Sequence, residues 1–215
     1  NLKTLFQSFD GANIQPLGSF GNIPPPILGG PSTVSQIKQA YPRIAAQSGF
    51  AEKIVEVAKS LSIPDPGWLA NAMGFETGYS FDPTIVNGAC LKEEPASKCA
   101  TGLIQFIPST ATNLGTTVTD LAKMNAVAQM DFVLKYFQPH KGRLNTAADL
   151  YMAIYYPKAV GKGPNYSIYN DILQSKGIGA ARQYYRRNGG IRTAGDYTNL
   201  ADRGARLPNQ LAPTE

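Results

Sequence analysis

Apolar residues recur at the spacing of an α-helix along much of the chain. In the segment 50–61, apolar side chains return every three or four residues, at Ile54, Val57, Ala58 and Leu61, which places them on one helical face. Similar patterns predict helices over residues 34–41, 66–77, 108–114, 119–124, 126–137, 146–156 and 179–186. Pro66 suits the first turn of its helix, where its missing N–H costs nothing. The pattern therefore predicts a mainly helical protein.

Two segments do not follow this pattern. Residues 11–31 (GANIQPLGSFGNIPPPILGGP) are crowded with glycine and proline, which predicts an extended arm or linker. Residues 87–106 form a polar loop that leads into the short, β-like stretch ATGLIQF. The 215 residues, 43% of them hydrophobic, suffice for one well-buried core. We expect an α+β, mainly α fold with a small β element: an arm at 1–31, one domain at 32–200 and a tail at 201–215.

One carboxyl group falls on the inner face of the helix predicted over 66–77. Leu69, Ala72, Met73 and Glu76 lie at i, i+3, i+4 and i+7, so Glu76 belongs to the apolar face. Desolvation and the partial negative charge of a helix C-terminus would both raise its pKa. Gly78 ends the helix and leaves this side chain at an edge. A carboxyl group that stays protonated at neutral pH suits the acid-catalysed cleavage of a glycosidic bond.

Three short motifs occur in a recognisable order: Glu76-Thr77-Gly78, then GLIQF at 102–106, then Tyr155 near the end of a later helix. This order resembles the goose-type lysozymes and soluble lytic transglycosylases of bacteria and their phages, which carry Glu-Ser or Glu-Thr, Gly-Leu-x-Gln and Ala-Tyr-Asn. The resemblance spans roughly residues 50–160 and is closest to phage tail-associated members. It implies a lysozyme-like fold and cleavage of the β-1,4 bond between N-acetylmuramic acid and N-acetylglucosamine in peptidoglycan. We expect no metal or other cofactor.

The resemblance implies a role for each matching residue. Glu76 would be the single catalytic carboxyl, which protonates the leaving oxygen and then acts as base on the muramyl 6-hydroxyl, so that a 1,6-anhydro sugar is released. Gln105 would bond a sugar N-acetyl group, and Gly102 would let the backbone approach the glycan. Tyr155 would bond near the Glu76 carboxyl and hold it in place. The other motif residues grouped with the substrate-binding set are Thr77 and Phe106.

The third motif departs from the family pattern. It reads Ala153-Ile154-Tyr155-Tyr156-Pro157, so Tyr156 stands where the family has asparagine. Two structural alternatives remain open. Tyr155 and its neighbour could be two aromatic rings that fill the core, and the amide of Gln105 could bond the backbone alone.

Other candidate residues have structural interpretations that we favour. Asp82 stands in SFDP, a turn sequence, and in the family the N-acetyl group of the substrate replaces a second carboxylate. His140, the only histidine, is interpreted as a surface-loop residue, and no Gly-x-Ser-x-Gly motif accompanies it. Glu93 and Glu94 are interpreted as solvated loop charges. The stretch GIGAA at 177–181 is half of a dinucleotide fingerprint, with no preceding strand.

The two cysteines, Cys90 and Cys99, permit two interpretations. Their spacing does not fit a CxxC redox pair, and no histidine stands near to complete a zinc site. They are either free thiols or a disulfide that closes a polar loop. A disulfide would contribute roughly 2–3 kcal/mol by the loop-entropy model and would indicate use outside a reducing cytosol.

A net charge of +5 at pH 7 and a pI near 9.1 suit an anionic partner such as nucleic acid, a membrane surface or a bacterial cell wall. Only the charge, and no nucleic-acid-binding motif, would support nucleic acid as the partner. No apolar run approaches the roughly 20 residues needed to span a bilayer. We therefore expect peptidoglycan glycan strands as the partner, with neither nucleic acid nor membrane insertion. Basic residues that form either a flank attracted to the wall or a scattered solvated surface are Lys158, Lys162, Arg182, Arg186 and Arg187.

The first residues, NLKTLFQSFDG, lack the charged start and long apolar run of a signal peptide. With the resemblance, this favours a virion- or tail-associated protein that acts in the bacterial periplasm or cell wall, docked to other tail or virion proteins through residues 1–31. The alternative is a non-catalytic structural or wall-binding tail component with a lysozyme-like shape. Retention of Glu76 together with Gln105 favours the enzyme, because a structural part has no reason to bury a carboxylate.

Overall fold

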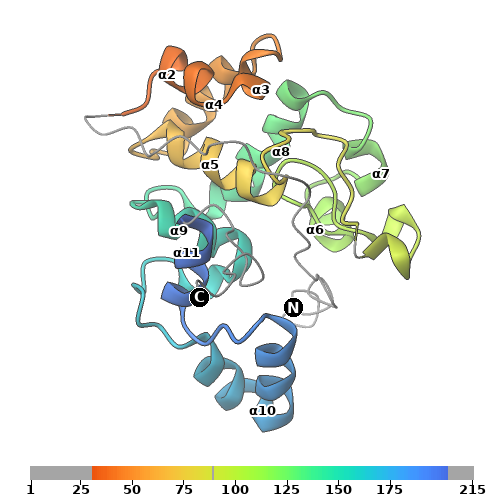
Figure 1. Cartoon of the computed structure of the whole chain (residues 1–215), viewed down its shortest axis with the longest axis vertical. Helices are drawn as coiled ribbons and strands as arrows, with labels where there is room; N and C mark the ends of the chain where they lie inside the picture. The colour runs from red at the N-terminus through yellow and green to blue at the C-terminus, as the bar shows by residue number, and fades with distance from the viewer. Residues whose placement is uncertain (1–30, 89, 203–215) are drawn as a thin grey trace, which may run out of the picture.

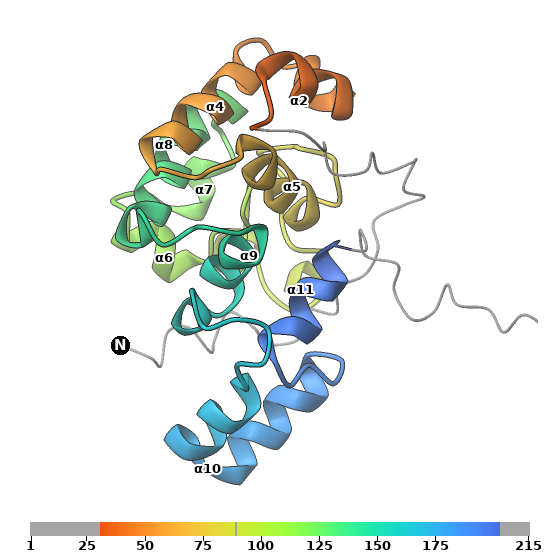
Figure 2. The same cartoon turned by 90° about the vertical axis from the view of Figure 1, so that its left-hand side faces the viewer.

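The structure is a computed structural model in which residues 31–88 and 90–202 are described. The predicted arm at 1–31, apart from its last residue, and the predicted tail at 201–215, apart from its first two, lie outside the described residues. Figures 1 and 2 show the helices distributed along the longest axis of the molecule, with α2 and α3 at one end and α10 at the other.

The described residues are mainly helical, as the hydrophobic pattern predicts. They form ten α-helices: α2 (Val34–Ala40), α3 (Pro42–Ala45), α4 (Phe50–Ser60), α5 (Pro66–Glu76), α6 (Pro108–Asn113), α7 (Val118–Leu121), α8 (Ala126–Phe137), α9 (Ala147–Tyr155), α10 (Ile168–Arg187) and α11 (Ala194–Asp202). Four short 3-10 helices connect them: η1 (Cys90–Lys92), η2 (Ala96–Lys98), η3 (Gln138–His140) and η4 (Pro157–Ala159). None of the described helices is long and apolar enough to cross a membrane.

Helix boundaries follow the local capping residues. The α5 helix begins at Pro66 because Asp65 accepts a hydrogen bond from the backbone N–H of Gly67 at 2.8 Å. The α8 helix covers the predicted range, and Asn125 caps its N-terminus. The predicted helix at 119–124 is shorter and shifted, because Thr117 caps α7. The short α3 helix was not predicted.

The core lies between α4, α5, α8, α9 and α11. The α4 helix packs against α8 and α5, α5 packs against α9, and α9 packs against α11. Side chains with at most 1% of their surface exposed connect these helices: Phe50, Leu69, Met73, Phe137 and Tyr151. The α5 helix is therefore held on two sides, so its C-terminal end has a fixed position in the domain.

The predicted β element takes the form of isolated bridges. Val86 pairs with Thr101, and Thr101 pairs with Phe106, both in antiparallel orientation. Residues 102–105 make the turn between Thr101 and Phe106, the two partners of the second bridge. The GLIQF motif is thus a tight turn held by two bridges, and within the described residues no longer strand ladder forms around it.

The C-terminal part contains more helix than predicted. The α10 helix extends far beyond the predicted range of 179–186, and it is interrupted at Gly177, whose φ of 82° departs from helical geometry. The rings of Tyr169 and Tyr185 lie 6.3 Å apart on opposite sides of this break. The two segments of α10 therefore fold back on each other as a hairpin, which lies at one end of the molecule (Figures 1 and 2). The α11 helix, absent from the prediction, then returns to pack against α9.

Cys90 and Cys99 form a disulfide. It closes a loop whose two ends are joined by a hydrogen bond from the Asn87 N–H to the Ala100 carbonyl at 2.8 Å. Of the two interpretations of the cysteines, free thiols or a disulfide, the disulfide is therefore confirmed. The loop ends directly before the bridge at Thr101, so the disulfide restrains the entry to the turn at 102–105.

Candidate active site

Glu76 is the last residue of α5, as the sequence predicts. The residues that share its helical face, Leu69, Ala72 and Met73, have no exposed surface. The Glu76 side chain is itself only partly exposed. It therefore stands where an apolar helix face reaches the protein surface, enclosed by protein on most sides.

The turn after Glu76 is rigid. The Thr77 hydroxyl donates to the Met73 carbonyl at 2.8 Å and accepts from the Phe81 N–H at 3.1 Å, which ties the turn to the helix. Tyr79 and Phe81 have positive φ values of 58° and 51°, a conformation that costs non-glycine residues energy and persists only where the surroundings impose it.

Glycine at position 74 permits this turn. A Cβ atom there would lie 2.6 Å from the Tyr79 ring, so only glycine lets the ring pack flat on α5. The Tyr79 hydroxyl then donates to Asn71 on the same helix at 2.9 Å. The chain folds back over α5, and these contacts fix the helix end that carries Glu76.

Burial dominates the electrostatics of Glu76. It raises the pKa of this carboxyl to about 7, since the charged form loses hydration that the site replaces only in part. A hydrogen bond opposes the shift: the Tyr197 hydroxyl donates to Oε1 of Glu76 at 3.4 Å, and a bond to the carboxylate lowers the pKa. Burial, and next the charge of Glu76, raise the pKa of Tyr136 and of Tyr197 above the ordinary value. Both phenols therefore remain protonated donors at neutral pH.

Tyr197 comes from α11 and belongs to an aromatic cluster around Glu76. Its ring stacks on Tyr155 with centroids 3.8 Å apart, and it meets Phe75 edge-on at 5.9 Å. The ring of Phe75 also meets Tyr151 edge-on at 6.2 Å. These rings supply the apolar surroundings that disfavour the charged carboxylate.

Sequence reasoning missed Tyr197, although a signal was present. Residues 193–196 read Thr-Ala-Gly-Asp, the spacing of a capping box. In the structure the Asp196 carboxylate accepts from the N–H groups of Arg192 and Thr193, and the Thr193 hydroxyl accepts from the Asp196 N–H. This motif marks the start of α11 and could have located the helix.

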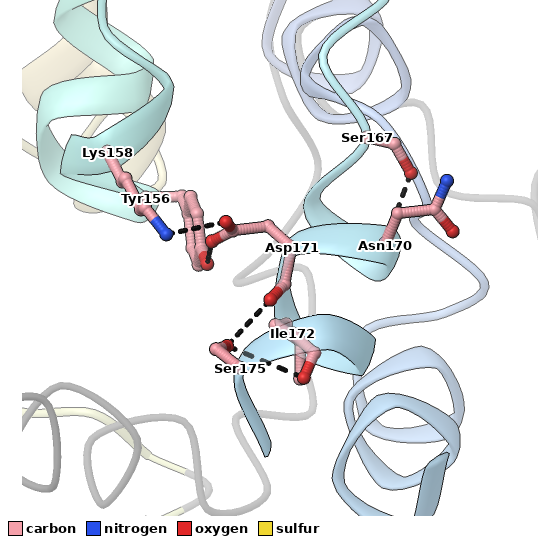
Figure 3. Close-up of polar contacts among 7 residues, drawn as sticks. All are labelled: Tyr156, Lys158, Ser167, Asn170, Asp171, Ile172 and Ser175. Carbon is pink, nitrogen blue, oxygen red and sulfur yellow. Dashed lines mark hydrogen bonds and ion pairs between the residues drawn. The ribbon is translucent and has the colours of Figure 1, made fainter. Parts of the chain in front are cut away.

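Tyr155 is linked to the Glu76 carboxyl through the ring of Tyr197. Its hydroxyl lies 2.7 Å from that of Tyr184, and the hydroxyl that bonds Glu76 is that of Tyr197, against which Tyr155 stacks. Tyr155 therefore supports the carboxyl through a neighbouring ring. Tyr156, which stands where the family has asparagine, donates to Asp171 on α10 at 2.5 Å (Figure 3).

Gln105 and Gly102 form one turn that is bonded to the chain following Glu76. The Gln105 amide donates from Nε2 to the carbonyls of Gly102 at 3.1 Å and of Ile85 at 3.4 Å. The Gly102 N–H donates to the same Ile85 carbonyl at 2.8 Å. The amide of Gln105 thus bonds the backbone, which is the structural alternative considered for it in the sequence analysis. The φ of Gln105 is positive, at 52°, and its side chain is partly exposed.

Gly102 is required by a neighbour that the sequence analysis did not identify. Its φ is +86°, and a Cβ atom there would lie 2.4 Å from Oε1 of Gln129. Gln129 is fully buried on α8; its Oε1 accepts from the Leu103 N–H at 2.7 Å, and its Nε2 donates to the carbonyls of Pro83 and Leu121. One buried amide therefore joins the turn at 102–105 to Pro83, in the segment that follows the turn after Glu76.

The predicted site residues fall into two groups. Thr77, Gly102, Phe106 and Tyr155 are buried, so they shape the site from within. Glu76 and Gln105 are partly exposed. Of these six residues, only these two side chains reach the surface.

Asp82 and His140, the other candidates from the sequence, are explained by their local contacts. Asp82 accepts from the N–H and the hydroxyl of Thr84, both at 2.8 Å, which is the predicted turn. The interpretation of His140 as a surface-loop residue is wrong in part, because it ends the short helix η3 and is half-buried, with a buried Nδ1 that has no hydrogen-bond partner. Burial, and next the charge of Arg143, lower the His140 pKa. Among the described residues, no three His, Cys, Asp or Glu side chains gather as metal ligands would.

The raised pKa of Glu76 has a consequence for stability. In the unfolded chain this carboxyl returns to its ordinary pKa of about 4.5, so between pH 4.5 and 7 the unfolded state releases its proton first and stability falls as pH rises. We expect Glu76→Gln to increase the free energy of unfolding by about 2 kcal/mol at pH 8 and to leave it unchanged near pH 4. Urea unfolding at the two pH values measures this, and equal stabilities at pH 8 would contradict it.

Comparison of the chain with protein-family models, with curated proteins and with solved structures gives no match. Function is therefore inferred from the residues and their geometry.

Proposed function

We propose that this protein is a peptidoglycan-degrading lytic transglycosylase or lysozyme that cleaves the β-1,4 bond between N-acetylmuramic acid and N-acetylglucosamine, on a lysozyme-like fold. The observation that carries the proposal is the Glu76 carboxyl, partly exposed at the end of an apolar helix and with a pKa raised to about 7. A large fraction of such a group is protonated at neutral pH, and it can still give up its proton.

A pKa near the working pH suits both halves of the reaction. Protonated Glu76 donates to the leaving glycosidic oxygen as the bond breaks. The resulting carboxylate, stabilised by the Tyr197 hydroxyl, then accepts a proton from the muramyl 6-hydroxyl or from water. Attack by the 6-hydroxyl oxygen on the sugar carbon yields a 1,6-anhydro sugar, and attack by water yields a hydrolysed one. The N-acetyl group of the substrate takes the role of a nucleophile, so one carboxyl suffices.

Gln105 is the proposed contact to that N-acetyl group. Its Nε2 is held by the carbonyls of Gly102 and Ile85, which fixes the orientation of the amide. We assign its Oε1 to the N–H of the sugar acetamide. The turn at 102–105 is bonded to Ile85 and, through Gln129, to Pro83 in the segment that follows Glu76, and this supports a fixed position of the sugar ring relative to that segment.

The disulfide supports a site of action outside a reducing cytosol. We propose that the protein is associated with a virion or phage tail and acts in the bacterial periplasm or cell wall. Residues 1–31 are proposed to dock it to other tail or virion proteins.

Digestion of purified peptidoglycan tests the proposal. We expect the wild-type protein to release soluble muropeptides, and mass spectrometry of their ends distinguishes 1,6-anhydro from hydrolysed products. A protein that sediments with the wall and releases no sugar would contradict the enzymatic proposal and favour a wall-binding tail component.

Tyr197 gives a prediction for the pH dependence of this activity. Because its hydrogen bond stabilises the carboxylate, Tyr197→Phe should raise the pKa of Glu76. The bond is long, so we expect the alkaline limb of the clearing rate to move up by roughly half a pH unit. The rate of wall clearing between pH 5 and 9 measures the shift. An alkaline limb that moves to lower pH would contradict the claim that Tyr197 stabilises the Glu76 carboxylate.

A further inference from the structure

The positive charge of the chain is concentrated in the region of the α10 hairpin. Residues 158–192 contain seven lysines and arginines and one aspartate, a net charge of +6, whereas the whole chain carries +5. The rest of the chain is therefore nearly neutral. This region includes α10, which Figures 1 and 2 place at one end of the molecule.

The single acidic residue of this region faces the body of the protein. The two carboxylate oxygens of Asp171 accept from the Tyr156 hydroxyl and from Lys158, each at 2.5 Å (Figure 3). Asp171 therefore anchors the hairpin to the segment after α9. Its charge is compensated there by Lys158 and does not neutralise the basic residues beyond it.

Three cations of the hairpin are exposed to solvent. Lys176, Arg182 and Arg186 are exposed, and the described residues include no ion pair to either of these arginines. The two arginines stand four residues apart, so they are neighbours on one face of the helix, where like charges repel. An anionic partner at this face would relieve the repulsion.

Three further observations restrict the class of partner. The apolar residues Ile172 and Ala181 of α10 are buried, so the hairpin has no apolar face to insert into a bilayer, and Ile178 is its one large exposed hydrophobic side chain among the described residues. Arg192 lies over the rings of Tyr169 and Tyr185, at 5.9 and 4.9 Å from their centroids. Covered rings are poor platforms for stacking nucleobases.

We infer that the exposed face of α10 carrying Arg182 and Arg186 binds an anionic cell-wall polymer, through its carboxylate or phosphate groups, and thereby holds the protein on its substrate. The inference rests on the proposed function for the choice of the wall as partner. Binding of this kind is electrostatic, depends on salt and needs no fixed register along the polymer.

A sedimentation assay with purified walls tests the inference. The Glu76→Gln protein serves as the background, so that the wall is not digested. Adding Arg182→Gln and Arg186→Gln should weaken wall binding roughly tenfold at about 50 mM salt, and the difference should vanish near 500 mM. The pair Arg182→Lys and Arg186→Lys retains the charge and should retain most of the binding.

The matched control removes the same two charges elsewhere. Arg43 and Lys59 are exposed near the opposite end of the molecule, on α3 and α4 (Figure 1). Changing both to glutamine should alter wall binding by less than twofold. Equal losses in the two double variants would overturn the inference.

Duplex DNA and vesicles of anionic lipid test the class of partner. Sugar release, measured beside wall binding, separates this inference from the proposed enzymatic activity. Tighter binding of the same protein to duplex DNA or to vesicles of anionic lipid than to walls would also overturn the inference. Wall binding that depends on Arg182 and Arg186, in a wild-type protein that releases no sugar, would refute the proposed activity and support the inference.

Discussion

Glu76→Gln should abolish the clearing of purified peptidoglycan, with a loss of at least about a hundredfold in rate. Proton transfer by a positioned acid typically contributes roughly 10²–10⁴-fold to a rate. The amide has nearly the shape of the protonated carboxyl, so it preserves the surroundings of the site while it removes the transferable proton. The rate of release of soluble muropeptides measures the effect.

Glu56→Gln is the matched control. The same chemical change is made on α4 at a side chain that is 63% exposed and paired with Lys53. We expect its clearing rate to equal that of the wild type. If both variants clear walls as fast as the wild type, Glu76 is not the catalytic acid and the proposed mechanism fails.

Gly102→Ala should destabilise the protein by about 2–4 kcal/mol, because two costs add. A φ of +86° is unfavourable for alanine, and the new Cβ atom would lie 2.4 Å from Oε1 of Gln129. The buried amide of Gln129 would have to move and would lose its bonds to the backbone of Leu103, Pro83 and Leu121. Urea unfolding measures the loss.

Gly115→Ala separates the two costs. Gly115 has a similar φ of +81°, but a Cβ atom there meets nothing within 4 Å. We expect this control to lose about 1 kcal/mol, the conformational cost alone. Equal losses at both positions would show that contact with Gln129 does not constrain the turn at 102–105.

The sequence predicted those helices whose apolar faces and capping residues are local. The α4, α5 and α8 helices match the predicted ranges to within one residue at each end, and the predicted position of Glu76 at the end of α5 is confirmed. The extents of α10 and α11 were missed, because the region after residue 161 is rich in glycine, tyrosine and arginine and its apolar positions are sparse. Their packing depends on contacts with distant parts of the chain.

The same limit applies to the candidate site. The placement of Glu76 on an apolar face was visible in the pattern, whereas its bond to Tyr197 joins residues 121 positions apart. Gln129 could have been noticed, because it lies four residues before Val133 on the buried face of α8. Its three backbone partners follow only from the fold.

The pKa of Glu76 itself is the most direct test of the central claim. Carboxyl carbon NMR of protein labelled at its glutamates, with Glu76→Gln used to assign the resonance, follows the titration of this one group. Burial predicts a midpoint near 7. A midpoint near 4.5 would show a hydrated, ionised side chain at neutral pH, and it would contradict the role of Glu76 as a proton donor.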